Sequence, residues 1–516
     1  MAGTRRALPR GDHLAGCRIP TDSLISKLPL SNSFEAGYLE YNGILPLEVA
    51  GERLRVAIAN EPAIEVLDDL ELSFGLPLDL VPVSHDALAD GIRRAFAAAE
   101  SVVELVRDLD AEVGTSGEGG DAPLADARDL ANQPPVIRFV NLLIREAHDA
   151  RASDIHLESA REGLRVRFRV DGVLSEVPNP PKALQAAVVS RVKLLAELDI
   201  AERRLPQDGR IRVRLEEREL DLRVSTVPTL YGESVVLRLL DRGGRPVALE
   251  DLGMGPATLE RFRVLAARPH GILLATGPTG SGKTTTLYAA LGLRQRAEEK
   301  IVTVEDPVEY HLDGVTQVPV NRKVGMTFAA ALRSILRQDP DVLMVGEMRD
   351  PETAEIAVQS AMTGHLVFST LHTNDAVGAL ARLLDLGVEA YLVAATLEGV
   401  LAQRLVRRIC PDCREPYAPD PQAVALLAQH PVGKRTLLRG AGCPACRGTG
   451  FRGRTGIFEL LTVSDEVKQA VARGMSAGDL RDLARGQGMV SLRQDGWTRV
   501  EAGITTVEEV LRVTEA

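Results

Sequence analysis

The feature that most constrains the fold is an eight-residue run that matches the phosphate-loop pattern G-x-x-x-x-G-K-[ST] in full: Gly277-Pro278-Thr279-Gly280-Ser281-Gly282-Lys283-Thr284. An apolar segment precedes it and a helical one follows, as such a loop requires. The glycines let backbone N–H groups turn toward phosphates, and the positive end of the following helix adds to the attraction. We therefore expect Lys283 to reach the β and γ phosphates of a nucleoside triphosphate, and the Thr284 hydroxyl to hold Mg²⁺.

Short apolar segments alternate with helical stretches from about residue 250 onward. They span residues 272–275, 301–304, 342–345 and 366–368. This alternation indicates a parallel sheet with crossover helices, in which ligands bind at the carboxyl ends of the strands. The predicted fold class is therefore multidomain α/β with a P-loop NTPase domain.

Carboxylates follow two of these segments. Glu305, Asp306 and Glu309 come just after the second segment, and Glu347 follows the third after one glycine, where a usual Walker B strand ends in Asp. Such carboxylates can orient hydrated Mg²⁺ or polarise the attacking water, although either group could also cap a helix. After an intact phosphate loop, catalysis is the favoured reading for Glu347.

Two histidines, His365 and His372, bracket the fourth segment. Polar groups at a strand tip beside a phosphate loop can sense the γ-phosphate and relay its loss. A histidine beside an apolar strand can also be structural, and both readings stay open, with the functional one favoured.

Four of the five cysteines form two C-x-x-C pairs, Cys410 with Cys413 and Cys443 with Cys446. Four thiolates suit tetrahedral Zn²⁺, and the two matched pairs favour a structural zinc site. A redox dithiol is the competing reading, but it needs only one pair. The fifth cysteine, Cys17, follows Leu14-Ala15-Gly16 as in a lipoprotein cleavage box, yet the polar residues before it make a signal peptide a poor fit.

Length and charge bound the remaining possibilities. A chain of 516 residues suggests three or four domains. The net charge of −11 and an aromatic content of 3% speak against a nucleic-acid partner. Because no apolar run approaches the ~18–20 residues of a membrane span, we expect an intracellular protein without a span of its own.

Turn-rich stretches divide the chain into expected domains. Residues 1–110 form an N-terminal domain, and 111–135, rich in glycine and proline, form an acidic flexible linker. Residues 136–243 form a small α+β domain, in which Leu164, Val166 and Phe168 alternate with arginines and Asp171-Gly172 marks a hairpin turn. Residues 244–516 form the ATPase domain, with a zinc subdomain at 396–455 and a helical part at 464–516.

The assembled motifs resemble those of the type II secretion and type IV pilus assembly ATPases. In order, the phosphate loop, residues 303–309, residues 336–350 and residues 364–373 resemble the Walker A, Asp box, Walker B and His box of that family. Residues 151–158, Gly496 and residues 505–510 also fit, so the resemblance covers about residues 135–516, and among the members it is to the type II secretion ATPases.

The resemblance implies a RecA-like motor domain preceded by a PAS-like α+β domain, assembled as a hexameric ring with ATP between the two domains. It implies that Arg223 and Arg238 approach the phosphates, a role that guanidinium groups suit. Glu347 would then position water or metal, and Glu309 or Glu305 would be the base. The resemblance also implies that three further arginines couple the subunits or contact the nucleotide, namely Arg333, Arg337 and Arg349.

The implied function is an ATP-hydrolysing motor on the cytoplasmic face of the inner membrane that drives pseudopilus growth and protein export. Its N-terminal domain would dock on an inner-membrane platform protein. A type IV pilus assembly ATPase is the alternative, and a nucleic-acid motor and a nucleotide-gated scaffold are the other classes considered. Related pilus ATPases bind cyclic di-GMP through repeated Arg-Leu-Gly motifs, and that repeat is not found here.

Overall fold

The computed structural model describes residues 36–50, 53–60, 62–74, 76–97, 102–103, 105–107, 109, 131–215, 218–241, 247–294, 297–418 and 437–514. Cys17 and most of the predicted linker lie outside these residues. Within the described ranges, no helix combines the length and the apolar character that crossing a bilayer demands.

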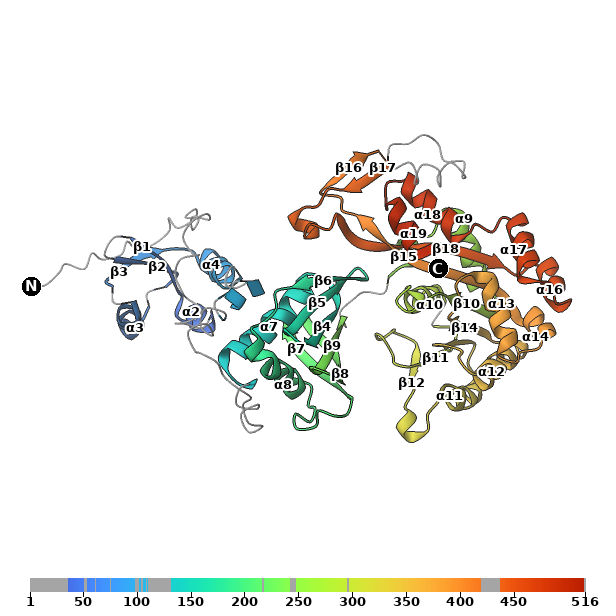
Figure 1. Cartoon of the computed structure of the whole chain (residues 1–516), viewed down its shortest axis with the longest axis horizontal. Coiled ribbons are helices and arrows are strands. Elements are labelled where there is room, and N and C mark those ends of the chain that lie inside the picture. Colours follow the sequence, from blue (N-terminus) through green and yellow to red (C-terminus); the bar gives the residue numbers. More distant parts are fainter. Residues whose placement is uncertain are drawn as a thin grey trace, which may run out of the picture.

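The N-terminal part is a small α+β unit with its own core (Figure 1). Its strands β1 (Ile44–Ala50), β2 (Arg53–Ile58) and β3 (Leu78–Pro82) form one sheet in the order β1-β2-β3, antiparallel and then parallel. Its helices are α2 (Ala36–Asn42), α3 (Ile64–Phe74) and α4 (His85–Ala97). Leu54, Val56, Ala57 and Ile58 of β2 are buried in this core.

The middle part is an antiparallel six-stranded sheet in the order β6-β5-β4-β9-β8-β7. Its strands are β4 (Ala152–Ala160), β5 (Gly163–Val170), β6 (Val173–Val177), β7 (Gln207–Leu215), β8 (Arg218–Thr229) and β9 (Gly232–Asp241), and its helices are α7 (Pro134–Asp149) and α8 (Gln185–Leu195). The predicted alternation on β5 is confirmed, because Leu164, Val166 and Phe168 are all buried. The predicted hairpin turn has positive φ at both Asp171 (50°) and Gly172 (85°), as a type I′ turn requires.

The edges of this middle core differ from the expected domain limits. Helix α7 begins at Pro134, within the last residues of the predicted linker. Val102, Leu105, Val106 and Leu109, which the sequence assigns to the N-terminal domain, pack in the same core as α7. The sequence of a short apolar segment does not determine which of two neighbouring cores buries its side chains.

The C-terminal part is built on a seven-stranded sheet in the order β12-β11-β13-β14-β10-β15-β18. The first six strands are parallel and β18 is antiparallel to β15. The four predicted strands are confirmed as β10 (Gly271–Thr276), β11 (Ile301–Glu305), β13 (Val342–Val345) and β14 (Leu366–Leu371). The others are β12 (Thr316–Pro319), β15 (Leu397–Ile409) and β18 (Phe451–Thr462).

Helices cover both faces of this sheet, which divides its apolar side chains into two clusters (Figure 1). They are α9 (Pro256–Ala266), α10 (Lys283–Leu291), α11 (Phe328–Ile335), α12 (Pro351–Met362), α13 (Ala376–Asp385) and α14 (Ala390–Thr396). Short 3-10 helices are η2 (Lys182–Leu184), η3 (Leu249–Leu252), η4 (Arg322–Val324), η5 (Leu336–Gln338) and η6 (Pro444–Cys446).

The chain end is helical, as predicted, with α16 (Asp465–Ala472), α17 (Ala477–Gly486), α18 (Leu492–Glu501) and α19 (Val507–Thr514). Ser464, Ser476 and Ser491 cap the first three of these helices by accepting a hydrogen bond from a backbone N–H. Between β15 and β18, the small antiparallel pair β16 (Arg414–Tyr417) and β17 (Leu437–Gly440) extends from the sheet and lies beside the cysteines.

Candidate nucleotide site

The phosphate loop joins the carboxyl end of β10, all of whose residues are buried, to the first turn of α10. Gly277, Gly280 and Gly282 have φ values of 147°, 79° and 88°, which favour glycine. A Cβ on Gly277 would lie 2.5 Å from the carbonyl oxygen of Gln403, so the loop passes too close to β15 for any side chain there. This is the strand–loop–helix arrangement that cradles phosphates.

Lys283 lies folded over this loop. Its Nζ donates hydrogen bonds to the carbonyl oxygens of Gly277 (2.8 Å) and Pro278 (3.1 Å). Burial lowers the pKa of Lys283 to about 8, against the opposing charge of Glu347. Thr284, the next residue, stands in the first turn of α10, so the residue types and the loop conformation fit a Mg²⁺-nucleotide.

Glu347 and His372 meet at the same edge of the sheet. Strands β13 and β14 pair in parallel with Val345 opposite Ser369, so the residues just beyond both strands emerge together. The Oε2 oxygen of Glu347 lies 2.6 Å from Nε of Arg349 and 3.6 Å from Nε2 of His372. Burial and the charge of Lys283 lower the pKa of His372, which favours a neutral ring beside the phosphate loop.

His365 lies at the opposite edge of the sheet. It directly precedes β14, and its carbonyl oxygen accepts from the N–H of Gly271, the first residue of β10. Its Nδ1 is 2.8 Å from the carbonyl oxygen of Ser360 at the end of α12. Six residues of strand, about 20 Å, separate the two edges, so the structure does not bring His365 to the phosphate loop, contrary to the expectation for the pair.

The two candidate bases after β11 have different surroundings. Glu305 is buried, and its carboxylate accepts from Thr303 (2.6 Å), Gln317 (3.2 Å) and the hydroxyl of Tyr288. Burial raises the pKa of Glu305 despite these bonds. Glu309 is exposed and lies close to Arg223: burial lowers the pKa of this guanidinium, and the charge of Glu309 opposes that shift. Of the two, Glu309 alone is free to face a nucleotide between the middle and C-terminal parts.

Arg223 and Arg238 stand in a row across the middle sheet. They are opposite each other on β8 and β9, with Arg210 of β7 opposite Arg223 on the other side. Directly paired residues of an antiparallel sheet share a face, so the three guanidinium groups gather on one surface. An Nη2–H of Arg223 points to the carbonyl oxygen of Val308, 3.5 Å away, which places this row against the segment that carries Glu309.

Asp154 closes the row, because its carboxylate accepts from Nε of Arg238 at 2.9 Å. Sequence reasoning missed Arg210 and Asp154, since strand pairing decides which arginines of an arginine-rich sheet are neighbours. Arg333 and Arg337 lie on α11 and η5, where Arg333 pairs with Glu352 and Arg337 donates to the carbonyl oxygen of Arg333. The first bond joins α11 to α12, and the second joins η5 to α11.

The four cysteines converge on one point. Their sulfur atoms all lie within 4.8 Å of one another, and three of the pairs are 3.7–3.8 Å apart. A tetrahedron with Zn–S bonds of about 2.3 Å has edges of about 3.8 Å, so the donor set and its size fit Zn²⁺. Backbone N–H groups of Gly442, Cys443 and Gly450 donate to the sulfurs and would stabilise thiolates.

Comparisons with known proteins show the family of this chain. Residues 129–512 match the family model of the type II/IV secretion system protein, and residues 19–102 match that of the MshEN domain. The type II secretion system protein E of Xanthomonas campestris pv. campestris is 47% identical over 492 residues, which cover 95% of this chain and 86% of that protein. The type IV pilus assembly ATPase PilB of Myxococcus xanthus is 44% identical over 473 residues, 91% of this chain and 83% of that protein.

The fold also resembles a solved structure. The X-ray structure of the Yersinia pseudotuberculosis ATPase DotB covers 77% of this chain and 96% of that chain, with a TM-score of 0.55 and 20% sequence identity. At that identity the likeness concerns the fold alone.

Proposed function

Because this chain belongs to the family of type II/IV secretion system proteins and is an ATPase of that family, we propose that its ATP hydrolysis drives pseudopilus assembly and protein export. The resemblance read from the motifs is thereby confirmed. The observation that carries the proposal is the meeting of Lys283, Glu347 and His372 at one sheet edge beside an intact phosphate loop. We place the protein on the cytoplasmic face of the inner membrane, held there by partners.

The chain's own residues divide the work of hydrolysis. Lys283 binds the β and γ phosphates, and Thr284 would hold Mg²⁺, which neutralises phosphate charge when bound. Glu347 positions the attacking water. His372, whose ring lies beside the carboxylate of Glu347, senses the γ-phosphate. Glu309 remains the better placed of the two candidate bases, with Glu305 serving the buried network around Tyr288.

The arginine row supplies positive charge from the middle part. Arg223 and Arg238 would stabilise the charge that builds on the phosphoryl group as the two parts close on ATP, an effect worth about 10³–10⁵-fold in other NTPases. The contact of Arg223 with the carbonyl oxygen of Val308 supports this placement. We also propose the division of the chain into domains at 1–110, 111–135, 136–243 and 244–516. Val102, Leu105, Val106 and Leu109, at the end of the first range, pack in the core of the middle part.

A structural zinc ion is proposed for the tetracysteine cluster. Its donor set is complete with four thiolates, so no coordination position is left for substrate or water. Zinc would fix the segment between β15 and β18, where β16 and β17 alone form a small sheet. The redox reading is disfavoured because all four sulfurs share one centre.

Two assembly properties complete the proposal. The chain would form a hexameric ring, and the segment that matches the MshEN domain would dock on an inner-membrane platform protein. Ring formation is tested by sedimentation of the full chain with and without a non-hydrolysable ATP analogue. A nucleotide-dependent hexamer supports it, and a monomer under both conditions contradicts it.

The pilus assembly function remains the second candidate because PilB is nearly as similar as the secretion protein, at 44% against 47% identity. Deleting the gene in its source bacterium separates the two. We expect loss of exported proteins from the culture medium with surface pili retained, and rescue by the wild-type gene but not by Lys283→Ala. Loss of pili with normal export would overturn the secretion assignment.

A further inference from the structure

Strand β15 passes directly behind the phosphate loop. It pairs in parallel with β10, and Ala402 lies opposite Thr276, the last residue before the loop. Gln403 and Arg404, the next two residues of β15, therefore lie beside the loop itself, and both are buried. Neither residue belongs to the motifs that identify a nucleotide site.

The side chain of Gln403 binds the backbone of the phosphate loop. Its Nε2 donates to the carbonyl oxygen of Ser281 at 2.6 Å, and its own carbonyl oxygen lies 2.5 Å from where a Cβ of Gly277 would stand. Gln403 thus contacts both ends of the phosphate loop. Two buried polar atoms at this contact, Oε1 of Gln403 and Oγ of Ser281, lack a hydrogen-bond partner within the described residues.

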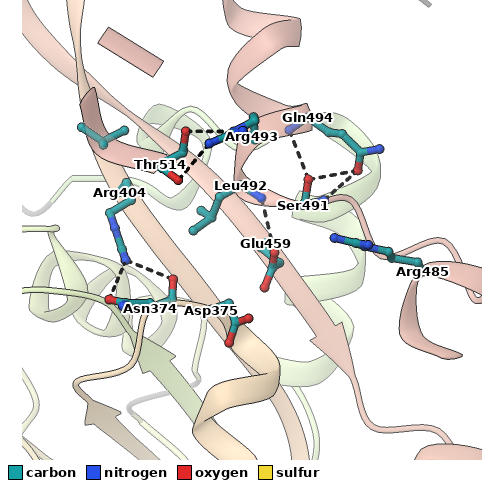
Figure 2. Close-up of a pocket in the computed structure, with 11 residues that line it drawn as sticks. Asn374, Asp375, Arg404, Glu459, Arg485, Ser491, Leu492, Arg493, Gln494 and Thr514 are labelled. Carbon is teal, nitrogen blue, oxygen red and sulfur yellow. Dashed lines mark hydrogen bonds between the residues drawn. The ribbon is translucent and has the colours of Figure 1, made fainter. Parts of the chain in front are cut away.

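Arg404 extends this contact to the loop that carries His372. One guanidinium nitrogen, Nη1, donates to the carbonyl oxygen of Gln403 at 3.1 Å. The other, Nη2, donates to the carbonyl oxygen of Asn374 at 3.0 Å, two residues after His372. Figure 2 shows Arg404 reaching Asn374 in a cavity of about 550 Å³, which Arg493 and Thr514 also line.

We propose that Gln403 and Arg404 are positioning residues that pre-organise the phosphate loop and fix it relative to the His372 loop. The bond from Gln403 holds the loop in its phosphate-binding shape before nucleotide arrives. The two bonds of Arg404 join the carbonyl oxygen of Gln403, which lies against Gly277, to the carbonyl oxygen of Asn374, and in this way link the phosphate loop to the loop that carries His372. This inference rests on the ATPase activity alone and is independent of whether secretion or pilus assembly uses it.

The expected size of the effect follows from pre-organisation. If Gln403 no longer holds the loop, only a fraction of molecules has the binding shape, and the apparent Kd for nucleotide rises by the inverse of that fraction. One buried hydrogen bond is worth about 1.4 kcal/mol, so that fraction falls to about one tenth. We expect Gln403→Leu, which keeps the volume and removes the donor, to raise the Kd about tenfold.

The test measures the Kd of a fluorescent ATP analogue and the kcat and KM for ATP on the full chain. Arg404→Lys keeps the charge but loses the planar fork that joins two carbonyl oxygens. Arg404→Lys removes the bond to the backbone carbonyl of Asn374 and a second one, at 3.4 Å, from Nη2 to the side-chain Oδ1 of Asn374, whereas Asn374→Ala removes only the second. We therefore expect both variants to lower kcat, Arg404→Lys more than Asn374→Ala, and the double variant to be no worse than Arg404→Lys alone. The matched control is Arg493→Gln. Arg493 lines the same cavity, but its guanidinium donates to Thr514. This variant should leave Kd and kcat within twofold.

Melting temperatures of all variants separate positioning from folding. A tenfold rise in Kd for Gln403→Leu, with a melting temperature like that of Arg493→Gln, supports the proposal. A Kd within twofold of wild type overturns it, as do additive effects of Arg404→Lys and Asn374→Ala. If Gln403→Leu does not fold, the double-mutant cycle decides, since Asn374 is an exposed loop residue whose substitution should leave the fold intact. If the wild-type protein itself did not hydrolyse ATP, the proposed function would be wrong, whatever the variants show.

Discussion

The carboxylate of Glu347 lies 3.6 Å from the imidazole Nε2 of His372, although the two residues follow different strands and are 25 positions apart in the chain. The parallel pairing of β13 with β14 creates this contact. Burial lowers the pKa of His372 and the charge of Lys283 lowers it further, so one imidazole interacts with both the phosphate loop and the catalytic carboxylate.

The first prediction concerns the two histidines. His372→Ala should lower kcat for ATP about tenfold or more, because the group beside Glu347 is lost, while nucleotide binding is retained. Phosphate release measures kcat, and a fluorescent nucleotide measures binding.

His365→Ala is the matched control, since His365 lies at the other edge of the sheet and bonds to Ser360. It should stay within twofold of wild type in kcat. Equal losses in the two variants would show that the position of His372 at the site carries no special role.

The second prediction concerns the arginine row. Arg223→Gln should reduce turnover about 10³-fold while the middle sheet stays folded, because a guanidinium that stabilises phosphoryl charge is removed. Arg165→Gln on β5 is the control, since Arg165 is exposed and pairs with Glu176. Turnover of Arg223→Gln within twofold of the control would remove this arginine from the mechanism.

The third prediction concerns the tetracysteine cluster. Elemental analysis should find about one zinc per chain, and a strong chelator should release it. The loss should unfold the segment between β15 and β18, because zinc binding is worth about 10 kcal/mol or more in small zinc peptides. The rate of amide hydrogen exchange in β16 and β17 measures this unfolding.

Cys446→Ser should abolish zinc binding, and Cys17→Ser should leave it intact, because Cys410, Cys413, Cys443 and Cys446 already supply the four ligands of a tetrahedral site. A full chain that is free of metal and still protects β16 and β17 from exchange would contradict the zinc assignment.

The fourth prediction concerns pH and the attachment of the last helix. Glu509 of α19 accepts from Nη2 of Arg407 at 2.6 Å and from Nε of Arg512 at 2.9 Å. Burial would raise the pKa of Glu509, but the hydrogen bonds from Arg512 and Arg407 outweigh it and hold this pKa at about 2, below its ordinary value of 4.5. The carboxylate therefore stabilises the fold fully above pH 4.5, and that contribution is lost as the pH falls toward 2.

A lowering of this size corresponds to about 3 kcal/mol. Glu509→Gln should reduce the protection of α19 amides from hydrogen exchange at pH 7, and its difference from wild type should shrink as the pH falls below 4.5. Glu508→Gln, exposed in the same helical turn, should change nothing. A difference that does not vary between pH 7 and pH 3 would show that the ion pairs are not its cause.

Several elements could be predicted because their signal is local. The phosphate loop, the strands β10, β11, β13 and β14, and the alternation of β5 each follow from consecutive residues. The tetracysteine cluster is equally local, since each pair is set by a two-residue spacing.

Contacts that depend on strand order could not be predicted. His365 and His372 look equivalent in sequence because both flank β14, yet the direction of that strand sends them to opposite edges. Glu305 and Glu309 both follow β11, and only packing against Tyr288 shows that Glu305 is buried. Gln403 lies 120 positions from Lys283 in the chain and meets the phosphate loop only because β15 is next to β10.

The central claim is that this sheet edge hydrolyses ATP with Glu347 as the group that activates water. The most direct measurement is the steady-state ATP turnover of the full-length Glu347→Gln variant beside wild type, with nucleotide affinity measured in parallel. We predict that turnover falls at least about 10²-fold while the affinity for ATP is kept, because the amide retains the shape but loses the charge. Turnover within twofold of wild type would contradict the account.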